Sequence, residues 1–156
     1  MTPDELPRVY ADTSVYGGAF DEEFKTPSRT FFDHVRSSKF QLVVSEAISN
    51  EIQGAPVTVR NLYTEMESLA EVAEGLREAV TLQRAYLRNG IVGETSMVDA
   101  LHVALATVAE CQVIVSWNFS HIVQFQKIPL YNKVSREEGF SEIAIHTPLG
   151  VIGDYD

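Results

Sequence analysis

The side chain with the clearest chemical potential in this sequence is Asp99, which lies in an otherwise almost entirely apolar stretch. Residues 94–111 are predicted to form one helix with apolar residues nearly all round, which is typical of a helix buried inside a domain. A buried carboxylate without a partner is costly, so Asp99 must be capped, paired or bound to a metal ion. The spacing of Ser96 and Asp99 also matches a capping box, in which Asp99 would have only a structural role.

Two further carboxylates follow predicted strands. Asp12 ends the apolar run 8–12, and ligands of open parallel sheets bind at the carboxyl ends of the strands. The alternative is that Asp12 closes the strand with an Asx-turn. Glu51 lies on the helix after the second strand and leans toward its apolar face, which leaves a site role and a surface role both open. Glu46, in the first turn of that helix, is explained by the helix dipole.

Together, Asp12, Glu51 and Asp99 predict a metal-dependent phosphodiesterase. Three carboxylates at one crevice would repel one another unless a cation held them, and Mg²⁺ prefers oxygen ligands. Such an ion can activate a water molecule and stabilise charge on a phosphate. The sequence has a single cysteine and no Gly-rich phosphate loop, which excludes zinc clusters and nucleotide-binding loops of that kind.

The elements that must position these acids alternate between strands and helices, which predicts an α/β fold: a three-layer α/β/α sandwich with a mainly parallel sheet. We expect a single domain over residues 1–156. Residues 13–18 are predicted to form a turn, Ser28 and Ser45 to be N-caps, and Leu76 and Val98 to face the core. The predicted strands are 8–12, 40–44, 113–116 and 142–146, and the main helices begin near Ser28, Ser45, Val59, Leu76 and Glu94.

The composition and net charge limit the classes of function and the cellular location that we expect. The net charge of −10 argues against a general nucleic-acid binder but not against a nuclease whose metal site contains some of these acids. Arg77, Arg84 and Arg88 share one helical face, as a solvated surface or as a track for RNA. The first residues do not resemble a secretory leader, and no apolar run is long enough to cross a membrane. With Cys111 as the single cysteine, we expect a cytoplasmic protein.

Four motifs in order resemble those of the PIN-domain family, and the likeness extends from about residue 8 to residue 147. They are Tyr10-Ala-Asp12-Thr-Ser-Val, Val44-Ser-Glu-Ala-Ile-Ser-Asn-Glu51, Val98-Asp99-Ala-Leu-His102-Val-Ala-Leu-Ala and Val115-Ser-Trp-Asn118-Phe-Ser-His121. The sequence is most similar to single-domain VapC-like toxin ribonucleases, in the subgroup with Ser-Trp-Asn-Phe-x-His. The resemblance implies a Mg²⁺- or Mn²⁺-dependent endoribonuclease, an RNA substrate, an antitoxin partner and a homodimer.

The resemblance also assigns roles to residues. It places the metal ligands at Asp12 and Asp99, and the second family acid at Glu51 rather than Glu46. Thr13 or Ser14 would support Asp12 or a phosphate through hydrogen bonds.

The departure from the family pattern is Asn118, where many members have an acid. Its amide oxygen could bind Mg²⁺ or a water ligand without adding charge, so Asn118 joins the candidate catalytic residues. His121 could contact phosphate or pack, and His102 is expected to pair with the backbone or a carboxylate. For Trp117 we expect packing rather than base stacking.

Two other functions remain open from the sequence. A PIN-fold module that binds RNA or protein with little cleavage is favoured by Asn118 and by the negative charge. A phosphatase or other hydrolase of small substrates could use the same acids.

Overall fold

A single parallel sheet forms the centre of the fold in the computed structural model, which describes residues 6–153. The expectation that there is no secretory leader rests on the first residues of the sequence. Of these, residues 1–5 lie outside the described residues. Five strands pair in the order β3-β2-β1-β4-β5, and every pairing is parallel. The strands are β1 (Arg8–Ala11), β2 (Gln41–Val44), β3 (Glu71–Val72), β4 (Val113–Val115) and β5 (Ala144–His146).

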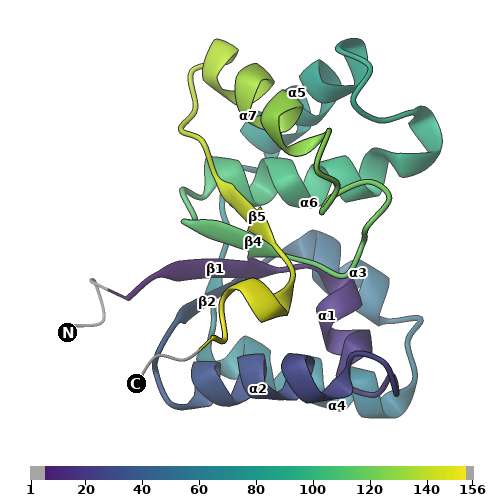
Figure 1. Cartoon of the computed structure of the whole chain (residues 1–156), viewed down its shortest axis with the longest axis vertical. Coiled ribbons are helices and arrows are strands. Elements are labelled where there is room, and N and C mark those ends of the chain that lie inside the picture. The colour runs from purple at the N-terminus through teal and green to yellow at the C-terminus, as the bar shows by residue number, and fades with distance from the viewer. Residues whose placement is uncertain (1–5, 154–156) are drawn as a thin grey trace.

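Helices cover both faces of this sheet, which confirms the predicted three-layer α/β/α architecture (Figure 1). On one face lie α2 (Lys25–Arg36) and α4 (Val57–Leu69), and α1 (Thr13–Gly18) runs from the end of β1 toward them. On the other face α6 (Met97–Val108) lies against the sheet, and α5 (Leu76–Arg88) and α7 (Ile128–Glu137) lie beyond it. Short 3₁₀ turns η2 (Glu94–Ser96) and η3 (Pro148–Gly150) precede α6 and follow β5, and α3 (Glu46–Ile52) contacts α1, α4 and α6.

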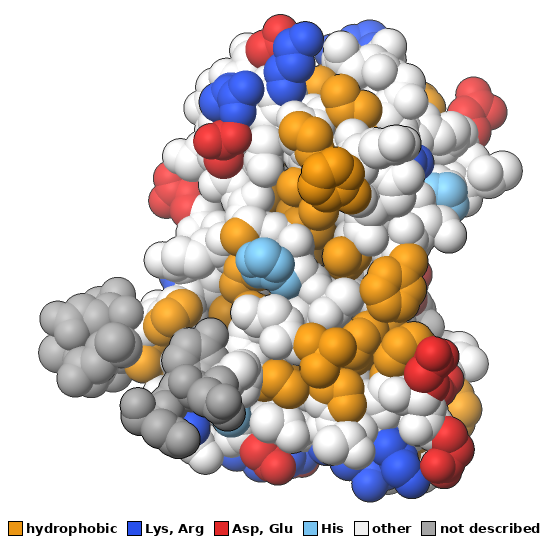
Figure 2. Space-filling view, viewed as in Figure 1, with side chains coloured by type: hydrophobic (Ala, Val, Ile, Leu, Met, Phe, Trp, Pro, Cys, Tyr) orange, Lys and Arg blue, Asp and Glu red, His pale blue; other side chains and the backbone are white. Residues whose placement is uncertain are grey.

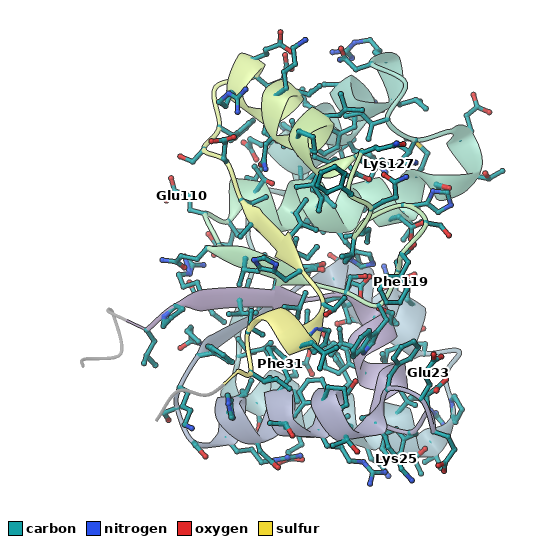
Figure 3. All side chains as sticks on the ribbon, viewed as in Figure 1. Glu23, Lys25, Phe31, Glu110, Phe119 and Lys127 are labelled. Carbon is teal, nitrogen blue, oxygen red and sulfur yellow. The ribbon has the colours of Figure 1, made fainter. Side chains whose placement is uncertain are left out.

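The position of α6 explains why its sequence is apolar nearly all round. It has the sheet on one side and α5 on the other, so Val103, Ala104 and Ala106 are all fully buried. The strands beneath it are buried on both faces, with Val9 and Tyr10 of β1 inaccessible to solvent. From the opposite layer, Phe31 of α2 contributes a fully buried ring (Figure 3).

Several local predictions were wrong. Residues 13–18 form helix α1 instead of a turn, because Asp12 caps it and its Val15 and Tyr16 are buried. Helix α2 begins at Lys25, so Ser28 lies inside it as a buried residue and not as the N-cap. Leu76 and Val98 are about half exposed instead of facing the core.

Two elements have no counterpart among the predicted ones. Strand β3 consists of Glu71 and Val72, both exposed, so it lacks the apolar run that marks a buried strand. Helix α7 buries only Tyr131, Val134 and Ser135, a stripe too narrow to be recognised from its periodicity. By contrast, Ser45 is the N-cap of α3 as predicted, and its hydroxyl accepts a hydrogen bond from the backbone N–H of Ile48.

The surface of the molecule is uneven in character. Apolar side chains gather over α7, β5 and η3 (Figure 2), where a groove is lined by residues that include Phe125, Ile128 and Ile145.

Arg77, Arg84 and Arg88 are all exposed on α5, as a solvated helix surface requires. Among the described residues, none of the helices is both long and apolar enough to span a bilayer.

Candidate active site

The predicted site residues come from elements that meet at the carboxyl edge of the sheet. Asp12 follows β1, and the loop with Asn118 follows the neighbouring strand β4. Glu51 is near the end of α3 and Asp99 is in the first turn of α6, and these two helices contact each other. Phe119, on the β4 loop, lies beyond this end of the sheet (Figure 3).

Asp12 is a buried carboxylate held by hydroxyl donors. It is 4% exposed, and its Oδ1 accepts hydrogen bonds from the backbone N–H and the hydroxyl of Ser14. Its Oδ2 accepts a hydrogen bond of 2.7 Å from the hydroxyl of Ser116. Burial raises the pKa of Asp12 above its ordinary value, and the charge of His102 and the hydroxyl donors oppose this rise only in part. Asp12 thus caps helix α1 and also lies at the carboxyl edge of the sheet, so the two predicted roles are compatible.

Glu51 is also held in place, through one of its two oxygens. Oε1 accepts a hydrogen bond of 2.7 Å from the Thr13 hydroxyl and a second hydrogen bond from Nε2 of His102. Burial alone would raise the pKa of Glu51, but the His102 and Thr13 hydrogen bonds and the His102 charge bring it below its ordinary value. Glu46 is exposed in the first turn of α3, in agreement with a dipole role, whereas Glu51 contacts His102 of α6, and its choice as the site acid stays a prediction.

His102 is almost fully buried and uses both of its ring nitrogens. Nε2 contacts Glu51, and Nδ1 lies 2.7 Å from the hydroxyl of Tyr10 on β1. The same Tyr10 hydroxyl lies 2.7 Å from Oγ of Ser45. Burial raises the pKa of Tyr10 well above its ordinary value, so it stays a neutral phenol. The expectation that His102 pairs with a carboxylate is therefore met.

Asp99 differs from the other two acids in having no partner within the described part of the chain. Ser96 is the N-cap of α6, but no side-chain hydrogen bond caps this helix, so the predicted capping box is not formed. Asp99 is half-buried, close enough to Tyr131 for its charge to contribute, after burial and Tyr86, to raising the pKa of that phenol. Its carboxylate is thus the most available of the three.

Asn118 stabilises the loop that follows β4 instead of offering a free ligand. Its Oδ1 accepts hydrogen bonds from the backbone N–H groups of Ser120 and His121, at 3.2 and 2.9 Å. Both lone pairs of the amide oxygen thereby serve the loop, and the binding of Mg²⁺ or its water by this oxygen stays a prediction. Nδ1 of His121 is buried and has no hydrogen-bond partner among residues 6–153.

Trp117 packs, as expected. Its ring stacks on Phe24 with centroids 4.3 Å apart, and its Nε1 donates to the hydroxyl of Ser28 at 2.8 Å. The backbone N–H of Trp117 donates to Oγ of Ser14, the hydroxyl that also supports Asp12. The packing of this indole therefore helps to set the position of the buried acid.

The site residue that sequence reasoning missed is Ser116. The sequence does contain an indication of this role. Ser116 directly follows β4, just as Asp12 directly follows the adjacent strand β1. Residues directly after neighbouring parallel strands meet at the same edge, so their side chains were bound to lie close together.

The positions of these side chains can be compared with the ligands that a Mg²⁺ or Mn²⁺ site needs. Within residues 6–153, the structure does not contain a group of three or more His, Cys, Asp or Glu side chains placed to hold a metal ion. The donor chemistry nevertheless suits Mg²⁺ or Mn²⁺ held by one or two carboxylates and water, because Asp99 has no partner and only Oε1 of Glu51 is engaged. A closed cage of three acids does not fit these side-chain positions.

Comparisons of this chain with protein-family models, with curated proteins and with solved structures found no significant match. The resemblance to PIN domains therefore stays a prediction based on its four sequence motifs.

Proposed function

We propose that this protein is a Mg²⁺- or Mn²⁺-dependent endoribonuclease of the PIN type. The observation that carries the proposal is the pair of anchored carboxylates, Asp12 and Glu51, together with the unpartnered Asp99, on elements that meet at the carboxyl edge of a parallel sheet. Ligands bind at this edge in open α/β folds. The first-turn position of Asp99 suits the helix dipole and also leaves its carboxylate free to bind a cation.

The residues that would hold the cation directly are Asp99 and Glu51, the latter through its unengaged Oε2. Asp12, whose two oxygens both accept hydrogen bonds, would reach the cation through a water ligand. A divalent cation bound there would lower the pKa of a water ligand and offset charge on the phosphate. The protein's own contribution is to fix the acids before substrate arrives. Ser14 and Ser116 hold Asp12, and Thr13 and His102 hold Glu51, so little reorganisation remains.

The partners follow from the same proposal. The substrate is RNA, and the sequence motifs support a role as the toxin of a toxin–antitoxin pair, with an antitoxin as protein partner and a homodimer as the assembly. We place this activity in the cytoplasm, where a lone buried Cys111 would remain a thiol.

The experiment that tests the proposal is RNA cleavage with defined metal content. The purified protein is incubated with a set of structured RNAs in Mg²⁺, in Mn²⁺ and in EDTA, alongside Asp12→Asn and Asp99→Asn. Discrete cleavage that requires metal and disappears in both variants would support the function. Equal cleavage by all three proteins would point to a contaminating nuclease, and absence of both cleavage and Mn²⁺ binding would contradict the proposal.

A second function, a module that binds RNA or protein without cleaving, is favoured by two observations. The oxygen of Asn118 is committed to its loop, and the three acids do not form a ready-made cluster. Calorimetry with Mn²⁺ separates the two functions, because a pure binding module has no need of the cation.

A further inference from the structure

The contact between His102 and Glu51 has a direction that the surrounding groups determine. A carboxylate can only accept, so the ring must donate to Glu51 through its Nε2–H. In a ring with one proton, Nδ1 then accepts, and the Tyr10 hydroxyl is the donor to it. The Tyr10 oxygen in turn accepts from the hydroxyl of Ser45. In a charged ring, Nδ1–H donates to the Tyr10 oxygen and the Tyr10 hydroxyl to Ser45, so Nε2–H donates to Glu51 in both charge states.

This chain of hydrogen bonds joins three elements around one acid. It begins at Ser45, the N-cap of α3, passes through Tyr10 on β1 and His102 on α6, and returns to α3 at Glu51. His102 is also three residues after Asp99 on α6, on the same side of the helix. The contact therefore fixes the last turn of α3 relative to the helix that presents Asp99.

The contact also distinguishes the two oxygens of Glu51. His102 and Thr13 both donate to Oε1, whereas Oε2 has no hydrogen-bond partner among the described residues. An oxygen that already accepts two strong donors is a poor ligand, so Oε2 is the one left for a cation.

We propose that His102 is a positioning residue that anchors Oε1 of Glu51 and thereby reserves Oε2 for the divalent cation. This inference rests on the proposed function, because it concerns the same site. It assigns a role to a buried histidine that is not itself a metal ligand, and it makes Tyr10 the group that holds the other ring nitrogen.

The test is the Mn²⁺ affinity of the metal-stripped full-length protein, measured by calorimetry in a double-mutant cycle. His102→Leu is expected to weaken Mn²⁺ binding by about 10- to 100-fold, the usual effect of losing a group that orients a ligand. His102→Gln, whose side-chain amide can donate near the position of Nε2, should recover most of this loss. In a Glu51→Gln background, His102→Leu should add little, because the oriented group is already gone.

Each alternative outcome has a distinct meaning. Equal weakening by His102→Leu in both backgrounds would show a general structural effect and overturn the positioning role. Unchanged affinity in His102→Leu, with Asp99→Asn still losing Mn²⁺, would overturn this inference and leave the proposed function standing. Failure of the wild-type protein to bind Mn²⁺ would overturn both.

A second measurement covers the case in which His102→Leu does not fold. Nitrogen NMR of the wild-type ring reports which nitrogen carries the proton. A hydrogen-bonded Nε2–H is expected, and Tyr10→Phe should disturb the Nδ1 signal. A ring with its only proton on Nδ1 could not donate to Glu51 and would overturn the inference.

Discussion

Asp12 and Ser116 are 104 positions apart in the sequence, yet the hydroxyl of Ser116 donates to the Asp12 carboxylate across 2.7 Å. The pairing of β1 with β4 makes this contact possible, since each residue directly follows one of these strands. The same Ser116 oxygen accepts the backbone N–H of Asn118 at 2.9 Å. One hydroxyl therefore holds both the buried acid and the start of the loop over the site.

Removing this hydroxyl should affect stability and pH dependence together. Ser116→Ala leaves a partly buried N–H without an acceptor and is expected to cost about 1–3 kcal/mol in the free energy of unfolding. It also removes a donor that favours the ionised form of Asp12, so the pKa of that acid should rise further. If cleavage needs ionised Asp12, the loss of activity on acidification will begin at a higher pH than in the wild type.

Urea unfolding and a pH–rate profile measure these two effects. Ser120→Ala is the matched control, because Ser120 is exposed in the same loop and its hydroxyl has no hydrogen bond among the described residues. A profile for Ser116→Ala that coincides with that of Ser120→Ala would contradict the role given to the Ser116 hydroxyl.

The buried charge of Asp12 should reduce stability when no cation is bound. Its pKa is raised in the folded state, so above that value folding must keep a carboxylate ionised where burial opposes it. Asp12→Asn is therefore expected to raise Tm in EDTA at neutral pH while abolishing activity. The gain should shrink as pH falls from neutral through the raised pKa of Asp12, because protonation of Asp12 relieves the same cost in the wild type.

Differential scanning calorimetry in EDTA across this pH range tests the prediction. Asp33→Asn is a suitable control, since Asp33 is exposed and pairs with Arg36 on the surface of α2. A wild-type protein that is as stable as Asp12→Asn at neutral pH in EDTA would contradict the sign of this effect.

Two adjacent glycines in α1 should respond differently to the same substitution. A Cβ on Gly18 would lie 2.8 Å from the Trp117 ring and from Oγ of Ser28, whereas a Cβ on Gly17 would meet nothing within 4 Å. Gly18→Ala is expected to destabilise by about 1–3 kcal/mol through overpacking. Gly17→Ala should be neutral or stabilise by up to about 1 kcal/mol, because alanine favours the helix.

Urea unfolding of the two variants gives a direct comparison, and each is the control for the other. Indole fluorescence should change only in Gly18→Ala, since the ring of Trp117 must move. Similar stability of both variants would mean that the contact between α1 and the indole is looser than described.

The sequence predicts the sheet well because its central strands are continuous apolar runs. It also favours Glu51 over Glu46, and predicts a carboxylate or backbone partner for His102 from its place one turn after Asp99 on a buried helix. Helix α1 could not be predicted in the same way, because six residues with Gly17 and Gly18 have low helix propensity. Its stability comes from the Asp12 cap and from burial of its apolar residues, which are tertiary effects.

The role of Asn118 is ambiguous in the sequence for a related reason. Its residue type is suitable for a metal ligand and for an Asx-type loop cap, and only the positions of the following backbone N–H groups decide between them. The missing capping box at Ser96 shows the same limit. Spacing indicates which contacts are possible, and the backbone path decides which form.

Phe119 is the exposed aromatic residue closest in sequence to the site, three positions after Ser116. It is 51% exposed, and its ring lies 6.2 Å from each of the rings of Phe24 and Trp117, which hold it at the end of the sheet. If RNA binds at the carboxyl edge, an unpaired base should stack on this ring. Stacking on an aromatic side chain contributes about 1–3 kcal/mol per base, so Phe119→Ala is expected to raise KM by about 5- to 150-fold with little change in kcat. Phe125→Ala is the control, because Phe125 is 90% exposed but lines the groove beside β5. Steady-state cleavage of a short single-stranded RNA measures both variants, and an equal KM for the two would exclude base stacking at Phe119.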